Sequence, residues 1–133
     1  MNGLTALQQD LREALGDLTS VEMTSTDRAP IYRVYVQIVP LSSRTETEAA
    51  AWQRVQATLS CISAHQETFE AESAIEVVIG LPEYVSKTKR RIFRVGGPLS
   101  ELERIKTQSP STSSSANVYI YKYDDWASHP RTP

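Results

Sequence analysis

Few residues in this chain have the types and spacing that covalent chemistry requires. Nucleophilic catalysis needs a nucleophile with a base beside it, and the sequence contains one cysteine and two histidines. Cys61 and His65 are spaced to share one face of a helix, but two ligands are too few to hold a structural metal ion. His129 has no comparable partner near it in the sequence. We therefore predict a non-enzymatic protein with no catalytic residue, no metal site and no cofactor.

The carboxylates and glycines give no stronger sign of a reaction. Glu67, Glu70 and Glu72 follow one another near the end of an expected helix, but acid–base catalysis needs carboxylates that share a pocket. The segment Gly96-Gly97-Pro98 lacks the Lys-Ser/Thr pair of a phosphate-binding loop. We interpret the three glutamates as an acidic surface patch.

One basic segment stands out against an acidic background. The stretch KTKRRIFR, Lys87 to Arg94, carries five basic residues and no acid, whereas the whole chain has a net charge of −2 and the remainder therefore −7 (−2 − 5). A strand with arginine on both faces is an edge strand or lies against a negative surface. We predict a basic interface that meets the acidic patch of a neighbouring copy, formed by Lys87, Lys89, Arg90, Arg91 and Arg94.

Aromatic residues gather near the end of the chain. They are Tyr119, Tyr121, Tyr123 and Trp126. Exposed aromatic side chains often anchor protein–protein interfaces. We predict that this group contacts a protein partner.

The elements that must position these residues follow from hydrophobic periodicity. Leucines from Leu4 to Leu18 predict an N-terminal helix that stops near Gly16, and Val21–Thr26 is a candidate short edge strand. The remaining pattern is β-α-β-β-α-β. It comprises strand Ile31–Val39, a helix of about 20 to 26 residues that starts near Ser43, strands Ile75–Ile79 and Lys87–Val95, a short helix Ser100–Ile105 and strand Val118–Tyr123.

This order predicts an α+β fold with a ferredoxin-like core. We expect an antiparallel sheet with the helices on one face and an added N-terminal helix. Residues 1–123 form a single domain, and residues 124–133 form a polar C-terminal tail. The predicted core consists of Val34, Val36, Ile38, Val55, Leu59, Ile62, Ile75, Val77 and Ile79.

Composition narrows the class of protein further. No apolar run approaches the length of a membrane span, and the N-terminal residues lack the apolar core of a secretory signal. A single cysteine excludes an internal disulfide. We expect an intracellular (cytoplasmic) or virion protein.

Two other functions are compatible with the same fold. RNA-recognition domains share the β-α-β-β-α-β order and stack bases on aromatics of two strands, for which Tyr35 and Phe93 are the counterparts here. The segment RRIFRVGG departs from their signature because it lacks the leading glycine and the second aromatic. A small-ligand sensor, with its ligand at a dimer interface, is the other alternative.

The first two thirds of the chain resemble the tail-terminator and tail-completion proteins of tailed bacteriophages. The resemblance covers Leu4 to Val95: an N-terminal helix, the strand YRVYVQIVP, the segment SSRTETEAAAWQRVQATL with Trp52 in its helix, and a β-hairpin. The elements after Gly96 depart from that pattern. The resemblance implies a ring-forming structural protein of the tail or neck that contacts neighbouring subunits. The function that we predict is therefore that of an assembly subunit of a larger complex.

Overall fold

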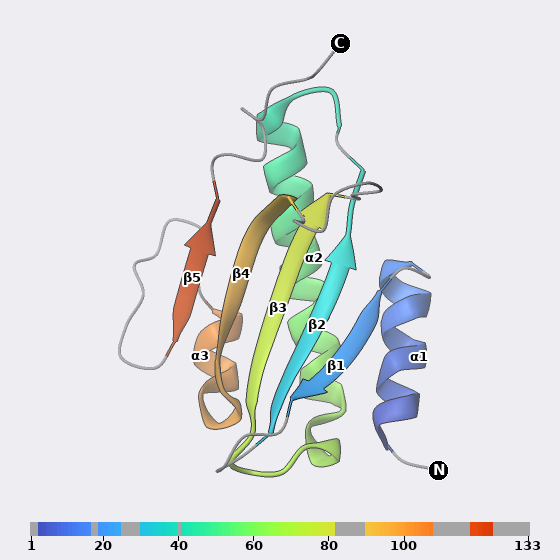
Figure 1. Ribbon diagram of the computed structural model, residues 1–133, viewed down its shortest axis with the longest axis vertical. Coiled ribbons are helices and arrows are strands. Elements are labelled where there is room, and N and C mark those ends of the chain that lie inside the picture. The colour runs from blue at the N-terminus through green and yellow to red at the C-terminus, as the bar shows by residue number, and fades with distance from the viewer. Residues whose placement is uncertain are drawn as a thin grey trace.

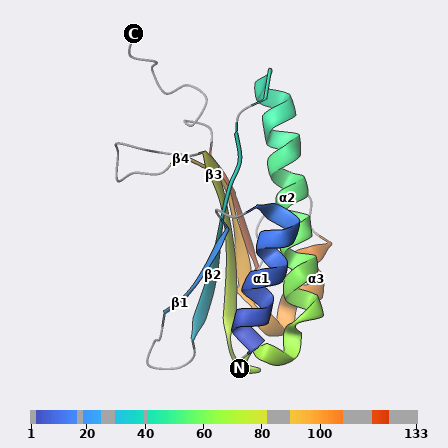
Figure 2. The same ribbon diagram turned by 90° about the vertical axis from the view of Figure 1, so that its right-hand side faces the viewer.

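A computed structural model of the chain describes residues 3–16, 19–24, 30–39, 41–81, 90–107 and 118–123. In chain order its elements are α1 (Gly3–Leu15), β1 (Ser20–Thr24), β2 (Ile31–Gln37), α2 (Arg44–Ala64), the 3₁₀ turn η1 (Gln66–Thr68), β3 (Ala74–Leu81), β4 (Arg90–Pro98), the 3₁₀ turn η2 (Leu99–Glu101), α3 (Leu102–Lys106) and β5 (Tyr119–Lys122). The strands form one sheet (Figure 1). The helices α1, α2 and α3 cover the same face of that sheet, and no helix of the described residues covers the other, which we call the open face (Figure 2). The predicted α+β class is confirmed.

The sheet differs from the expected ferredoxin-like arrangement. Its five strands lie in sequence order, β1-β2-β3-β4-β5. The prediction had four strands in the core and Val21–Thr26 as a further candidate edge strand. β2 and β3 are direct neighbours and run parallel, while the other pairs are antiparallel. The sheet is therefore mixed, not antiparallel. The helical connection α2 leaves β2 and β3 running in the same direction, and the two strands pair directly, with no strand inserted between them.

Two helix ends predicted from capping residues are confirmed, the C-terminal end of α1 and the N-terminal end of α2. α1 ends where Gly16 adopts a φ of +108°, a conformation that glycine takes without strain. α2 begins after Ser43, whose hydroxyl oxygen accepts a hydrogen bond from the backbone N–H of Glu46 at 3.1 Å. The strand predicted to end at Val95 runs further, because β4 continues through Gly96 and Gly97 to Pro98.

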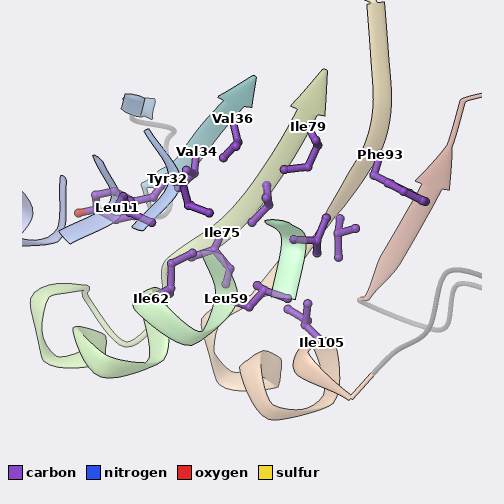
Figure 3. Packing of buried hydrophobic residues seen from close by; sticks show 14 of the residues in the cluster. Leu11, Tyr32, Val34, Val36, Leu59, Ile62, Ile75, Ile79, Phe93 and Ile105 are labelled. Carbon is purple, nitrogen blue, oxygen red and sulfur yellow. The ribbon is translucent and has the colours of Figure 1, made fainter. Parts of the chain in front are cut away.

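The core lies between the sheet and the helices (Figure 3). All nine predicted core residues are buried, and so are Leu7, Leu11 and Leu15 of α1 and two residues of α3. The hydrophobic side chains of β2 and β3 that face the helices alternate with residues of the open face. The short edge strand is confirmed as β1, which pairs antiparallel with β2.

A β-bulge in β4 interrupts the regular alternation of its side chains between the two faces of the sheet. Ile79 pairs with Phe93, whereas the next residue, Gly80, pairs with Arg91, so Ile92 is an extra residue on β4. Such a bulge interrupts the strict alternation of side chains. Ile92 and Phe93 are both buried, although the sequence pattern had assigned them to opposite faces.

Candidate functional site

The candidate site is a cluster of charged and aromatic side chains on the helix-free face of the sheet. Strand register places these residues in rows that cross the strands. One row joins Glu22, Arg33, Glu76, Gly96 and Tyr119, from β1 to β5. The neighbouring row joins Ser20, Tyr35, Val78, Arg94 and Tyr121. Residues from four strands therefore meet around the position of Glu76.

Glu76 is the centre of this cluster and is only 3% exposed. Its Oε1 accepts a hydrogen bond from Nε of Arg33. Its Oε2 accepts hydrogen bonds from Nε of Arg94 at 2.6 Å and from the hydroxyl of Tyr119 at 2.5 Å. A buried carboxylate is tolerated when charge-assisted hydrogen bonds of this kind replace its hydration. We call Arg33, Glu76, Arg94 and Tyr119 the Glu76 network.

Glycine at position 96 makes the network possible. A Cβ atom there would lie 2.5 Å from the carbonyl oxygen of Ile75 and 2.7 Å from the hydroxyl oxygen of Tyr119. Gly96 stands between Glu76 and Tyr119 in the same row. The missing side chain thus leaves the space through which the tyrosine hydroxyl reaches the carboxylate.

The network has a formal charge of +1, from two guanidinium groups and one carboxylate. Burial raises the pKa of Glu76, but the hydrogen bonds from Tyr119, Arg94 and Arg33 outweigh it and bring the pKa below its ordinary value. Burial and the hydrogen bond to Glu76 raise the pKa of Tyr119. The carboxylate is therefore ionised and the phenol protonated at neutral pH.

Two of the predicted interface tyrosines lie side by side at this site. The ring centroids of Tyr119 and Tyr121 are 5.7 Å apart, and Cζ of Arg94 lies 5.6 Å and 5.5 Å from them. Tyr121 is 52% exposed, whereas the hydroxyl of Tyr119 turns inward to Glu76. Tyr123 packs against the core, and Trp126 lies outside the described residues.

A hollow of about 300 Å³ opens beside the network. Its lining combines apolar and cationic groups and consists of Ile31, Arg33, Ala74, Glu76, Arg94, Gly97, Pro98 and Tyr119. The volume is at the lower end of the range that small-molecule sites occupy, about 300 to 1,000 Å³. Guanidinium groups at its wall suit an anion and offer no nucleophile.

One residue of the predicted basic interface, Arg94, belongs to the Glu76 network. Arg94 is paired with Glu76, so it is no longer an uncompensated charge. Arg91 pairs in register with Gly80 at the start of β4. Lys87 and Lys89, like the side chain of Arg90, lie outside the described residues. The acidic residues Glu67, Glu70 and Glu72 are all exposed, at and just after η1.

Of the two residues predicted to stack on bases, Tyr35 and Phe93, only Tyr35 lies on the open face. Phe93 is 1% exposed and lies on the helix-covered face, where its ring packs edge-on against Trp52 at a centroid distance of 5.2 Å. Its pairing with Ile79 places it there, in regular alternation with Arg94 and Val95. Tyr35 does lie on the open face, next to Val78 and Arg94 in its row.

Cys61 and His65 are positioned by the contact between α1 and α2. The Nε2 atom of His65 lies 2.5 Å from Oδ2 of Asp10 on α1. Burial raises the pKa of the Cys61 thiol, and the charge of Asp10 adds to this effect, so the thiol is a poor nucleophile. Within the described ranges, no group of three or more histidine, cysteine, aspartate or glutamate side chains is arranged to hold a metal ion.

Sequence reasoning had missed Glu76 as a site residue. The available signal was a single glutamate within an apolar strand, AIEVVIGL, with arginines on the two strands that pair with it. Only the register of β2, β3 and β4 reveals that these side chains meet.

Comparison of the chain with models of protein families, with curated proteins and with solved structures found no match. In the described part of the chain, no helix has both the length and the apolar character needed to cross a bilayer.

Proposed function

We propose that this chain is a non-enzymatic assembly subunit that associates with copies of itself into a ring, of the kind that terminates a bacteriophage tail or forms part of its neck. The resemblance of residues 4–95 to tail-terminator and tail-completion proteins supports the more specific role. The proposal depends most on how charge is distributed over the two ends of the sheet.

Arg91 of the predicted basic interface lies at the opposite end of β3 from the acidic residues. Arg91 is beside Gly80, close to the end of β3. Glu70 and Glu72 come immediately before Ala74, where β3 begins. Figure 1 shows these two ends at the top and bottom of the long axis. Two surfaces so far apart cannot neutralise each other within one copy, but they can pair head to tail between copies.

A head-to-tail contact is heterologous, and its repetition gives a ring when the rotation closes. Charge pairing across such a contact sets register and partner choice more than affinity. Exposed apolar side chains at the same end as Arg91 add area to the contact: Val39 is 72% exposed and Leu41 is exposed as well.

Charge reversal tests the proposal. The double variant Arg90→Glu, Arg91→Glu should dissociate the oligomer in native mass spectrometry while circular dichroism stays unchanged. Arg104→Glu, an exposed position on α3, is the matched control and should leave the oligomer intact. Combining Arg90→Glu and Arg91→Glu with Glu70→Lys and Glu72→Lys should restore association. A wild-type chain that stays monomeric at every concentration would overturn the proposal.

A second candidate function is binding of single-stranded nucleic acid on the open face. The observation that favours it is the combination of Tyr35 and Tyr121 with the guanidinium groups of Arg33 and Arg94 on one uncovered sheet face. Stacking of bases on aromatic side chains, with arginine nearby, is the usual chemistry of such sites. RNA should then bind with steep salt dependence, and Tyr121→Ala should weaken binding. Absence of retention in a low-salt filter assay would exclude this candidate.

A further inference from the structure

The hollow beside the Glu76 network has donors that its internal contacts do not exhaust. A guanidinium group has five N–H donors. Both Arg33 and Arg94 use Nε for Glu76. Among the described residues Arg33 also contacts Tyr35, and Arg94 also contacts Tyr119 and Tyr123, which leaves N–H groups of each guanidinium unused. Their side chains are 28% and 35% exposed. The remaining N–H groups are therefore available to a ligand at the wall of the hollow.

The net charge of the network indicates what charge a ligand in the hollow should carry. Glu76 neutralises one of the two guanidinium charges, so the network attracts a single negative charge. Glu22 is the other acid in the row, on the far side of Arg33 from Glu76, and it is exposed to solvent. A planar carboxylate matches the fork of arginine N–H groups. A dianion would meet Glu76 at the floor of the hollow.

The hollow also has an apolar part. This part is lined by Ile31, Ala74 and Pro98, beside the two arginines. These three residues lie in neighbouring strands, because Ala74 pairs with both Ile31 and Pro98. A ligand with its carboxylate at the arginines would place a short aliphatic group against them.

We infer that this hollow binds a small aliphatic carboxylate, with Arg33 and Arg94 holding the carboxylate and Ile31, Ala74 and Pro98 holding the aliphatic group. This activity goes beyond the assembly role and does not depend on it. The Glu76 network fixes the two guanidinium groups before the ligand arrives, so little side-chain freedom is lost on binding.

Nuclear magnetic resonance titration tests the inference. We would add isobutyrate to the full-length ¹⁵N-labelled chain and follow the arginine Nε–Hε signals and the amide of Gly97. Saturable shifts of these signals are expected with isobutyrate. The neutral isostere isobutyramide should produce none. Equal shifts with both compounds, or none with isobutyrate throughout the millimolar range, would overturn the inference.

Variants separate the roles of charge and space. Arg33→Gln should weaken isobutyrate binding about tenfold or more, as the loss of a charge-assisted hydrogen bond does. Ala74→Leu fills the hollow without removing a charge and should also weaken binding, so it keeps the test decisive if Arg33→Gln fails to fold. Arg104→Gln on α3 is the control of equal charge loss and should bind as the wild type. Unchanged binding in both Arg33→Gln and Ala74→Leu would contradict the assignment.

Light scattering on the same samples identifies the source of the carboxylate. If isobutyrate disperses an oligomer, an acidic side chain of another copy supplies it. If association is unaffected, the ligand is a free acid. Because binding is read directly from the shifts, failure of the ring proposal leaves this result intact.

Discussion

The two faces of the sheet are buried by different means. On the helix-covered face, aliphatic and aromatic side chains of β2, β3 and β4 pack against α1, α2 and α3 (Figure 3). On the open face no helix of the described residues lies above the strands (Figure 2), yet Glu76 and Val78 are as buried as core residues. There, long neighbouring side chains such as Arg33 and Arg94 provide the cover.

This difference shows why one strand can be buried on both faces without a second helix layer. Each residue of β3 after Ala74 is buried. The covered face is stabilised by removal of apolar area from water, which depends little on pH or salt. The open face depends on the ionised state of one carboxylate and on its three donors. The comparison predicts mutations that act on one face only.

The largest effect should come from the covered face. Phe93→Ala removes a buried ring that packs against Trp52, and we expect a loss of about 3 to 5 kcal/mol in the free energy of unfolding. Urea denaturation at neutral pH measures it. Tyr121→Ala, a half-exposed aromatic on the open face, is the matched control and should cost under about 1 kcal/mol. Similar small losses for both would mean that Phe93 is not a core residue.

The next effect belongs to the open face. Glu76→Ala leaves two guanidinium groups and a tyrosine hydroxyl without their shared acceptor. Breaking a buried pair costs about 3 to 5 kcal/mol, but both arginines reach solvent, so we expect about 2 to 3 kcal/mol. Glu22→Ala, an exposed acid in the same row, should change stability by less than about 0.5 kcal/mol. Equal losses of stability for the two glutamate variants would show that the Glu76 network does not stabilise the fold.

The two faces also differ in how far the sequence predicts them. Periodicity identified the covered face well, because apolar residues at alternate positions, such as Val34 and Val36, are a local signal. The network is non-local, since Glu76 is 43 residues from both Arg33 and Tyr119. The strand order adds a further non-local choice, because a helical connection is compatible with either direct pairing of β2 with β3 or an inserted strand. Phe93 was misassigned because its face is set by its pairing with Ile79 on β3, which no local signal gives.

A smaller loss of stability is expected from adding a side chain at Gly96, where the network leaves no room for a Cβ atom. Gly96→Ala introduces a Cβ atom within 2.7 Å of the Tyr119 hydroxyl and 2.5 Å of a backbone oxygen of β3. Tyr119 must move away and lose its hydrogen bond to Glu76, at a cost of about 1 to 3 kcal/mol. Thermal unfolding measures the loss. In the double variant Gly96→Ala, Tyr119→Phe the alanine should cost less than it does alone, because no hydrogen bond remains to be lost. An additive result would show that the two residues are independent.

The smallest effect is a pH dependence carried by the open face alone. The pKa of Glu76 is lower in the folded chain than in the unfolded one. Its contribution to stability is therefore complete above the ordinary glutamate pKa of about 4.3 and is lost as the pH falls from there through the lowered folded pKa.

Urea denaturation at a series of pH values should show this loss as a steeper acid decline for the wild type than for Glu76→Gln. Glu48, whose pKa is also below its ordinary value because its hydrogen bonds to Arg44 and Lys122 outweigh the opposite effect of burial, titrates equally in both proteins and cancels in their difference. The difference should therefore be constant from about pH 6 to pH 8 and shrink toward pH 3 by about 1 kcal/mol or more. A difference that stays constant down to pH 3 would mean that the carboxylate of Glu76 is not the group that holds the open face together.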